Sequence, residues 1–456
     1  MNGSAMTQTK IIVLDDDPTG SQTVHSCQLL TRWDAPTLQA ALLDTSLPNP
    51  SPLFFVLTNT RGMDATRAAS TTREVCRNLK LALADLAAGG KVFNPIFVSR
   101  SDSTLRGHYP VETDAMAEEL GPGLGGEGAN FDAHFLIPAF FEGGRYTRNS
   151  MHYLMVDNVP KPVHETEFAR DSVFGYRHSY LPDYVEEKTA GRIKAGEVER
   201  FLLEDVRGDV SARLMALHGN RCCVVDAETQ ADLNHFADQL QAAAARGKRF
   251  LFRSAASLLT ALAKLPPQPV APEAMRVYVR DNKPGAVIVG SHVKKTTAQL
   301  EKLLAEPGIV GIEVDVARIE PARAALLQSV LDQAARAHAA GSTCVVYTSR
   351  VERQFADQAT RLAFGEAVSS FLMDVVRGLP TTLGFLIGKG GITSNDVLSD
   401  GLALKTSTVL GQILPGCSVV RCPADHPRYP DLPVVIFPGN VGDDAALATA
   451  YRRLSA

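Results

Sequence analysis

Short, continuously apolar runs alternate with longer amphipathic stretches along this chain, and no other feature constrains the fold as strongly. IIVLD at 11–15, LFFVLTN at 53–59 and PIFVS at 95–99 are too short for core helices and have no polar face. Runs of this kind are typical of strands buried on both faces, and their alternation with helical stretches predicts parallel β-α-β units. We therefore expect an α/β fold in which largely parallel sheets are flanked by helices.

The alternation covers most of the chain and restarts after a proline-rich segment. Further strands are expected at HFLIPAF (134–140), CCVVDAE (222–228), RFLFRS (249–254), AVIVGS (286–291), IVGIEVD (309–315), TCVVYTS (343–349), TLGFLIG and PVVIFPG. Between them, LPPQPVAPEA at 265–274 holds four prolines in ten residues, which is typical of a linker. A chain of 456 residues also exceeds the roughly 250–300 residues at which single cores stop growing. We predict two α/β domains, 1–264 and 285–456, joined by a linker over 265–284.

The composition argues against several classes of protein. Forty-six basic residues against 50 acidic ones give a net charge of −4, so no nucleic-acid or membrane-surface partner is expected. No apolar run reaches the roughly 18 residues that span a bilayer, and the first residues lack the apolar core of a signal peptide. Seven cysteines without a C-x-x-C pair are typical of reduced thiols. These features predict a cytoplasmic protein.

An acidic turn follows directly after the first predicted strand. Asp15, Asp16 and Asp17 precede a Pro-Thr-Gly turn that ends at Gly20. In open α/β sheets, ligands bind beyond the carboxyl ends of the strands. Three adjacent carboxylates repel one another unless Mg²⁺, an arginine or a substrate hydroxyl lies among them. The turn is therefore a candidate site, and the structural alternative is a solvated turn in which Asp17 caps the next segment.

Two further strand ends carry arginines. Arg61 in TNTRG is placed to bind a carboxylate with two hydrogen bonds, or alternatively to pair with Asp64 at the surface. The turn SRSDSTLRGHYP at 99–110 concentrates polar groups suited to a polyol acid, and its candidates are Arg100, Ser101, Asp102, Ser103 and Arg106. Asp102 is also a candidate general base, whereas Ser103 or Thr104 is alternatively a helix N-cap.

A glycine-rich turn opens a long stretch, 145–200, with little periodicity. Such stretches in compact domains are usually functional or mobile. Gly143-Gly144 allows the backbone to approach a ligand closely, and Arg145 beside it is a candidate binding residue. His152, in the same stretch, is more typical of a structural histidine.

The C-terminal half contains three turns in which a predicted strand runs through glycine into a helix. They are GSHVKKTTAQL at 290–300, FLIGKGGITSNDVL at 385–398 and IFPGNVGDDAAL at 436–447. Backbone N–H groups and the helix dipole hold anions at such turns, so three of them predict a phosphate or nucleotide site. The chain has no G-x-x-x-x-G-K-[ST] and no G-x-G-x-x-G after its first strand, so neither a P-loop nor a nicotinamide cofactor is indicated.

Taken together, these motifs resemble those of the four-carbon acid sugar kinases, a former family of unknown function that includes threonate, erythronate and 3-oxo-tetronate kinases. The similar segments are DDPTG (16–20), DSTLRG (102–107), PAFFEGGRYT (138–147), GGITSNDV (390–397) and PGNVG (438–442). The resemblance spans nearly the whole chain. It implies a sugar-acid-binding N-terminal domain, a nucleotide-binding C-terminal domain, an active site in the cleft between them, and ATP with Mg²⁺ as cofactors.

The resemblance also implies roles for individual residues. Asp16, Asp17 and Asp102 are expected to be catalytic. The sugar acid is expected to contact Asp16, Arg61, Arg100, Ser101, Asp102, Ser103, Arg106 and Arg145. ATP is expected to contact Ser291, Gly390, Gly391, Ile392, Thr393, Gly439 and Asn440.

Several departures from the family pattern indicate a divergent branch. Arg100 replaces a usual lysine, Ile392 replaces a commonly acidic or polar residue, and Phe437-Pro438 replaces Lys-Ser. His292-Val293-Lys294-Lys295 stands where small residues and serine are usual.

The implied reaction is transfer of the ATP γ-phosphoryl group to a terminal hydroxyl of threonate, erythronate, a 3-oxo-tetronate or 3-oxo-isoapionate. Two alternatives remain open: a nucleotide- or sugar-acid-binding protein with weak or no catalysis, and an isomerase or aldolase on the same scaffold. A homodimer is the commonest assembly for such enzymes.

Overall fold

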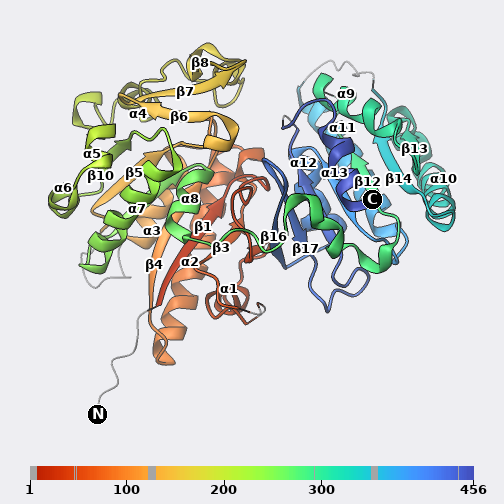
Figure 1. Ribbon diagram of the computed structural model, residues 1–456, viewed down its shortest axis with the longest axis horizontal. Coiled ribbons are helices and arrows are strands. Elements are labelled where there is room, and N and C mark those ends of the chain that lie inside the picture. The colour runs from red at the N-terminus through yellow and green to blue at the C-terminus, as the bar shows by residue number, and fades with distance from the viewer. Residues whose placement is uncertain are drawn as a thin grey trace. The chain divides into compact units, whose positions relative to one another are not determined.

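The computed structural model of the chain describes residues 8–45, 47, 49–121, 130–291, 293–350, 358–439 and 441–455. These residues form two compact units. The N-terminal unit comprises the chain up to Thr23 together with Arg32–Pro266, and the C-terminal unit comprises Val24–Thr31 together with the chain from Pro267 onward. Each unit is an α/β structure with helices beside its strands (Figure 1), which confirms the predicted fold class.

The N-terminal unit is built on a parallel sheet. Its strands are β1 (Gln8–Asp15), β3 (Leu53–Leu57), β4 (Phe93–Arg100), β5 (Ala133–Ile137), β9 (Glu199–Phe201), β10 (Arg221–Val225) and β11 (Phe250–Ser254). They lie in the order β3-β1-β4-β11-β5-β10-β9, and every neighbouring pair is parallel. The helices are α1 (Ala35–Leu42), α2 (Ala65–Ala88), α3 (Val111–Leu120), α4 (Leu181–Lys188), α5 (Leu203–Arg207), α6 (Ser211–Ala216), α7 (Gln230–Ala245) and α8 (Ala256–Ala263).

Both faces of this sheet are buried, as its continuous apolar runs predict. Phe54, Phe55, Phe97, Phe135 and Phe252 are all at most 2% exposed. Three helices of this unit, α1, α2 and α7, begin at a residue whose side chain caps the first turn. For example, the Asp64 carboxylate accepts from the Arg67 N–H at 2.9 Å, which starts α2.

The stretch 145–200 contains a small antiparallel sheet, although its sequence shows little periodicity. Strands β6 (Arg145–Arg148), β7 (Met151–Val156) and β8 (Val159–Pro162) pair in sequence order. The two turns between them consist of Asn149-Ser150 and Asp157-Asn158, and all four residues have positive φ. Two-residue turns of this kind match the right-handed twist of a hairpin, which explains how such short strands pair.

The C-terminal unit has a mixed sheet. Its strands are β2 (Cys27–Leu30), β12 (Ala286–Val289), β13 (Ile309–Val314), β14 (Thr343–Thr348), β15 (Leu386–Lys389), β16 (Thr406–Leu414), β17 (Cys417–Arg421) and β18 (Pro433–Phe437). The order β13-β14-β12-β15-β18 is parallel, and β17, β16 and β2 continue it antiparallel. The helices are α9 (Lys294–Leu304), α10 (Ile319–Ala339), α11 (Gln358–Gly378), α12 (Gly391–Asp396) and α13 (Ala446–Ser455).

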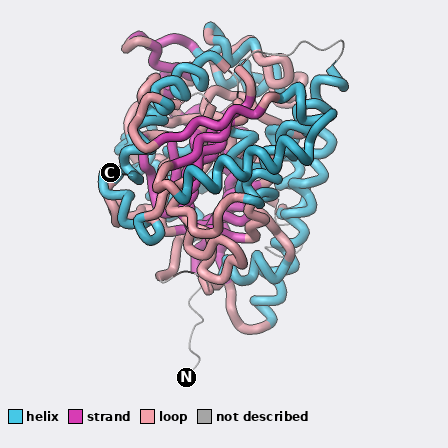
Figure 2. The backbone as a smooth tube through the Cα atoms, turned by 90° about the vertical axis from the view of Figure 1, so that its right-hand side faces the viewer, coloured by secondary structure: helices cyan, strands magenta, loops and turns pink. Residues whose placement is uncertain are grey.

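The core of this unit lies where helices cover the central strands. Val287, Ile387 and Val435 form one cluster with Leu300 of α9 and Leu447 of α13. Figure 2 shows strands bordered by helices. Within the described part of the chain, no helix combines the length and apolarity that a membrane span requires.

Candidate functional site

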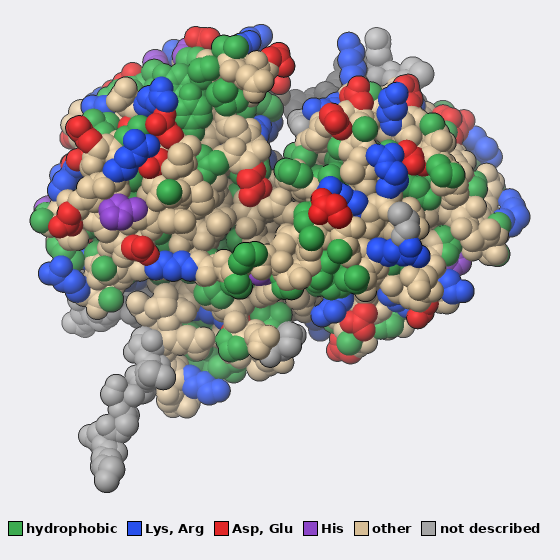
Figure 3. Space-filling model, viewed as in Figure 1, with side chains coloured by type: hydrophobic (Ala, Val, Ile, Leu, Met, Phe, Trp, Pro, Cys, Tyr) green, Lys and Arg blue, Asp and Glu red, His purple; other side chains and the backbone are tan. Residues whose placement is uncertain are grey.

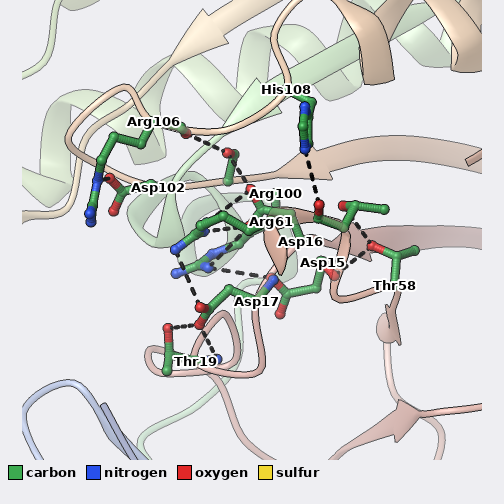
Figure 4. A network of polar contacts seen from close by, with 12 residues as sticks. Asp15, Asp16, Asp17, Thr19, Thr58, Arg61, Arg100, Asp102, Arg106 and His108 are labelled. Atoms are coloured by element: carbon green, nitrogen blue, oxygen red, sulfur yellow. Dashed lines mark hydrogen bonds and ion pairs between the residues drawn. The ribbon is translucent and has the colours of Figure 1, made fainter. Parts of the chain in front are cut away.

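The parallel strands of the N-terminal unit bring three sequence motifs to one edge of its sheet. Asp15 at the end of β1 is in register with Leu57 at the end of β3 and with Arg100 at the end of β4. Ser254 at the end of β11 is in register with Arg100 as well. The acidic turn, TNTRG and SRSDSTLRG therefore meet, as Figure 4 shows for Asp16, Arg61 and Arg100.

Asp16 is the centre of the polar network at this edge. Its Oδ1 accepts from Nη2 of Arg61 at 2.5 Å, and its Oδ2 accepts from Oγ of Ser101 at 2.6 Å. Nε of Arg61 donates to Oδ2 as well, at 3.3 Å, so the guanidinium binds this carboxylate through two nitrogens. The Asp16 side chain is only 1% exposed. Asp16 thus orients Arg61 and Ser101, the residues that flank it.

Asp15 lies beneath the turn rather than facing outward. It is fully buried, and its Oδ1 lies 3.3 Å from Nη1 of Arg100. Burial raises the pKa of Asp15 to about 8 despite the attraction of Arg100, and repulsion from Asp16 and Asp17 adds to the increase. A Cβ on Gly20 would lie 1.9 Å from Oδ2 of Asp15, so the turn closes over this carboxyl only because residue 20 is glycine.

Asp17 is the member of the acidic turn with a partly exposed carboxylate. Its Oδ1 accepts from the N–H and the hydroxyl of Thr19 at 2.9 and 2.5 Å. Its Oδ2 lies 3.4 Å from Nη1 of Arg61, and its side chain is 18% exposed. Burial alone would raise the pKa of Asp17, but Arg61 and the hydrogen bonds from Thr19 outweigh burial and lower it. Asp17 is therefore an ionised acceptor at neutral pH.

Asp102 is a second ionised carboxylate with an exposed portion. Its Oδ2 accepts from Nε of Arg106 at 2.8 Å and from the Thr104 hydroxyl. Burial opposes ionisation, but Arg106 and Arg61 hold the pKa of Asp102 well below its usual range. The guanidinium of Arg106 also lies over the Phe168 ring, 4.8 Å from its centroid. Asp102 and Arg106 thus form a fixed pair at the same edge.

A buried chain of polar residues supports the network from below, and it lies outside the motifs that the sequence indicates as candidate sites. Nη2 of Arg253 donates to Oγ of Ser101 at 2.6 Å, and Nη1 donates to Oε2 of Glu112 at 2.5 Å. Oε1 of Glu112 accepts from the Thr60 hydroxyl at 2.5 Å. The sequence could have indicated Arg253, because this charged residue lies at the end of an apolar run. No sequence pattern indicates Glu112 in α3.

Gly107 allows these groups to pack together. Its φ is +116°, and a Cβ there would lie 2.4 Å from Oγ of Ser101, 2.7 Å from Nη2 of Arg253 and 2.9 Å from Oδ2 of Asp16. Residues with side chains rarely adopt this φ. The glycine of DSTLRG is therefore required both by its backbone conformation and by the space that it leaves to the network.

Arg145 differs from the other arginines of the site. Its Nη1 donates to the Gly143 carbonyl at 2.5 Å, and the guanidinium lies 5.7 Å from the Phe140 centroid. Its Nε is buried and has no hydrogen-bond partner, and no ion pair of Arg145 occurs among the described residues. Burial lowers the pKa of Arg145, while Asp102 acts in the opposite direction. Arg145 is thus a cation whose carboxylate partner is not supplied within the described part of the unit.

Two histidines near the site are structural. His152 is fully buried, and its Nε2 and Nδ1 lie 2.8 Å from the Ser103 carbonyl and 2.9 Å from the Thr147 hydroxyl. Burial lowers the pKa of His152 to about 4, so the ring is neutral near pH 7. His108 holds the Thr60 and Met63 carbonyls through its Nε2, at 3.1 and 2.9 Å. His152 thus holds the backbone carbonyl of Ser103 in place.

The C-terminal unit gathers its glycine turns in the same way. Val289 of β12 is in register with Lys389 of β15, and Lys389 is in register with Phe437 of β18. Gly290-Ser291, Gly390-Gly391 and Pro438-Gly439 follow these strand ends directly. Parallel pairing therefore brings Ser291, Gly390 and Gly439 to one edge of the sheet.

Packing around Gly390 explains why glycines occur in these turns. Gly390 has a φ of +116°, and a Cβ there would lie 3.4 Å from both Cβ of Ser291 and Oγ1 of Thr393. A Cβ on Gly290 would lie 2.5 Å from Oγ1 of Thr393. A Cβ on Gly439 would meet no atom of a described residue within 4 Å, its chain neighbours aside. Ile392 is 72% exposed, and Asn440 and His292 lie outside the described residues.

The carboxylates of the site are not arranged as a set of magnesium ligands. Within the residues that the structure describes, no three His, Cys, Asp or Glu side chains gather as metal ligands. Asp16 and Asp102 are engaged by arginines and hydroxyls, and Asp17 by Arg61 and Thr19. These residues do not form a preformed magnesium cage, and Mg²⁺ in kinases characteristically arrives with the substrate phosphates.

Comparison with known proteins identifies the family. Residues 11–262 match the family model of a sugar-binding N-terminal domain, and residues 286–447 match that of a nucleotide-binding C-terminal domain. A D-erythronate kinase of Heliobacterium modesticaldum is 29% identical over 142 residues, which is 31% of this chain and 30% of that protein, so the match spans about a third of the relative's length.

Two solved structures share the fold. A Salmonella typhimurium LT2 protein described provisionally as a tRNA synthase has a TM-score of 0.68 and 19% identity, with 98% of this chain and 99% of that chain covered. A Haemophilus influenzae protein of the DUF1537 family has a TM-score of 0.61 and 18% identity, with 97% and 100% covered. With both domain models matched in order along the sequence, the chain belongs to the four-carbon acid sugar kinase family.

Proposed function

We propose that this protein transfers the γ-phosphoryl group of ATP to a terminal hydroxyl of a four-carbon sugar acid, with erythronate and threonate as the first substrates to test. One observation carries the proposal. The cationic Arg145, which has no ion pair among the described residues, lies within electrostatic range of Asp102 at an edge that also presents the partly exposed carboxylate of Asp17. A sugar acid offers the matching groups, one carboxylate and several hydroxyls. The erythronate kinase relative and the two family domains support this choice.

In the proposed complex, Arg145 binds the substrate carboxylate, because a guanidinium matches a carboxylate in charge and geometry. Asp17 and Asp102 accept hydrogen bonds from substrate hydroxyls, and one of them accepts the proton of the attacking hydroxyl. Asp16 keeps the guanidinium of Arg61 in place beside Asp17, where its charge counters that of the transferring phosphoryl group. Arg100, Ser101, Ser103 and Arg106 complete the proposed binding site.

We assign the nucleotide to residues 285–456, which lie within the C-terminal unit, and the sugar acid to residues 1–264. Ser291, Gly390, Gly391, Ile392, Thr393, Gly439 and Asn440 are the residues proposed to contact ATP. No described residue other than its chain neighbours would lie within 4 Å of a Cβ on Gly439, which supports a close backbone approach to a ligand at that turn. Mg²⁺ would supply charge neutralisation on the phosphates of its ATP complex. The contribution of the chain is mainly positioning and electrostatic stabilisation.

The proposed partners are small molecules, and the location is the cytoplasm. On the face drawn in Figure 3, basic and acidic side chains are interspersed, unlike the one-sign surface of a nucleic-acid-binding protein. All seven cysteines are buried and free of disulfides, which supports a reducing compartment.

The test is a coupled assay of ADP release with MgATP and a panel of erythronate, threonate, 3-oxo-tetronate and 3-oxo-isoapionate. At least one acid should stimulate ADP release well above the rate without acid. Arg145→Met should raise KM for that acid by roughly 10-fold to 100-fold, as expected for a lost charge-assisted bidentate contact. Arg148→Met, three residues along the same strand, is the control, because Arg148 is 54% exposed and pairs with Glu228.

Other outcomes favour the alternatives. If ATP binds but none of the acids stimulates ADP release, the kinase proposal is wrong and a binding protein without catalysis is favoured. If an acid is consumed equally well without ATP, an isomerase or aldolase is favoured. An Arg145→Met variant with unchanged KM would remove Arg145 from the carboxylate site while leaving the kinase proposal standing.

A further inference from the structure

A buried lysine lies at the strand edge assigned to the nucleotide, and neither the motifs nor the comparisons give it a role. Lys389 is the last residue of β15, and its side chain is 0% exposed. Its Nζ donates to the carbonyls of Pro438 and Gly439 at 2.7 and 3.0 Å. The ammonium also lies 4.6 Å from the centroid of the Phe437 ring. Lys389 therefore binds the Pro438-Gly439 turn from the interior side through two hydrogen bonds.

No acid among the described residues balances the charge of Lys389. Among the described residues no carboxylate forms an ion pair with it, and the charged neighbour that acts on it is a second cation, Lys295. Burial, with repulsion from Lys295, lowers the pKa of Lys389 to about 8. The facing Cys417 is neutral near pH 7, since burial raises the pKa of its thiol to about 12. An isolated buried ammonium is costly, so an anion that binds nearby gains from its field.

The hydrogen bonds of Lys389 also act on the conformation of the turn. An ammonium has three N–H donors, and two of them point at the carbonyls of Pro438 and Gly439. These carbonyls are thus held toward Lys389, and a Cβ on Gly439 would meet no described residue within 4 Å, its chain neighbours aside. Backbone that presents its N–H side to open space, with a positive charge behind it, is suited to binding phosphate oxygens.

We propose that Lys389 is an internal cation of the nucleotide site, which holds the Pro438-Gly439 turn in a phosphate-binding conformation and supplies positive charge to the polyphosphate of ATP or ADP. This inference rests on the proposed function. Lys389 is a positioning residue, because its ammonium is covered by the turn that it holds. Its effect should therefore depend on the phosphates of the ligand and on the protonation of Lys389.

The experiment measures binding of ATP, ADP and adenosine to the full chain by calorimetry. Lys389→Met keeps the length of the side chain and removes the charge. It should weaken ATP binding on the order of 10-fold to 100-fold, the size of one charge–charge interaction near a protein surface, and leave adenosine affinity within about twofold. Lys405→Met is the control for a change in net charge, since Lys405 is an exposed lysine of the same unit.

A second measurement uses the wild-type protein alone. ATP affinity should fall between pH 7.5 and 9.5, because ATP binds better when Lys389 is protonated and its pKa is about 8. Lys389→Met should show a flat profile over this range. If the variant does not fold, the wild-type profile decides, and a flat profile would overturn the inference.

The failures of the inference and of the proposed function are distinguishable. If wild type binds ATP and Lys389→Met binds ATP equally well, the inference is wrong and the kinase proposal stands. If the variant loses ATP and adenosine affinity equally, Lys389 only maintains the fold, and the charge role is overturned. If wild type binds neither ATP nor ADP, the nucleotide assignment falls together with the inference.

Discussion

Replacing Gly107 by alanine tests whether the site is organised as described. The substitution adds one methyl group at the point where Ser101, Arg253 and Asp16 converge, at 2.4, 2.7 and 2.9 Å from the new Cβ. It also forces a residue with a side chain to adopt a φ of +116°. Overpacking and backbone strain therefore act together at Gly107. The same substitution at a second glycine, where only the strain arises, separates the two effects.

Gly247 provides the matched control. It lies in the same unit with a φ of +95°, and a Cβ there would meet nothing within 4 Å. Gly247→Ala therefore introduces backbone strain alone, which costs about 1–3 kcal/mol of the free energy of unfolding. Gly107→Ala adds overpacking of about 1–3 kcal/mol, for a total of about 2–6 kcal/mol. Displacement of the network by a fraction of an ångström should also lower kcat/KM by roughly 10-fold to 100-fold.

The free energy of unfolding is measured by urea titration with the fluorescence of Trp33. This is the one tryptophan in the sequence, and it belongs to the N-terminal unit. Turnover is followed by ADP release. We expect Gly107→Ala to be less stable than Gly247→Ala by about 1–3 kcal/mol and to lose activity, while Gly247→Ala keeps it. Equal stability of the two variants, together with normal turnover of Gly107→Ala, would refute the assigned packing.

Three further predictions concern the same network. Burial raises the pKa of Asp15 from its ordinary 3.8 to about 8. Between about pH 4 and 8 the native state therefore holds a proton on Asp15 that the unfolded chain has released. As pH rises through this range, Asp15 lowers the free energy of unfolding. Asp15→Asn should remove this pH dependence of the free energy of unfolding, which is on the order of 1.4 kcal/mol per pH unit. Urea titrations at pH 5 and 7.5 measure the difference in free energy of unfolding between the variant and wild type, and an equal difference at both pH values would contradict the prediction. Asp16→Asn should lower turnover at least 100-fold, because Arg61 loses its charged partner. ATP affinity measured by calorimetry should be unchanged. Near-normal ADP release by the variant would show that Asp16 is dispensable. Glu112→Gln should lower the free energy of unfolding by about 3 kcal/mol, because the Arg253 cation stays buried without its acid, and a urea midpoint equal to that of wild type would show that the ion pair contributes nothing.

The parallel cores could be predicted from the sequence because each buried strand is a continuous apolar run. IIVLD and PIFVS fall within β1 and β4, and LFFVLTN covers β3 and continues two residues beyond its end at Leu57. Once the strands are parallel, their carboxyl ends must share an edge. The convergence of the acidic turn, Arg61 and Arg100 follows from that geometry and needs no tertiary information.

Contacts between distant segments could not be predicted, because no local pattern encodes them. The short strand β2 pairs with β16, and the Ser407 hydroxyl donates to the Leu29 carbonyl across 378 residues of sequence. The partnership of Glu112 with Arg253 is of the same kind. The register of β15 and β18 also pairs Lys389 with Phe437. Phe437 stands where the family usually has a lysine. A relation between neighbouring strands of this kind is visible only in three dimensions.

The placement of β2 has a consequence for how this protein is made. Val24–Thr31 belongs to the C-terminal unit, yet it emerges from the ribosome some 378 residues before its hydrogen-bonding partner in β16. At 5–20 residues per second, that interval lasts about 20–75 s. Throughout this interval the edge of CQLL that pairs with β16 lacks its partner strand, and in the last part of it, once Pro266 has been made, the N-terminal unit is already fully synthesised. Nascent chains therefore pass through a stage in which the N-terminal unit is fully synthesised while one edge of β2 is still open, and an open strand edge of this kind is what a chaperone would protect.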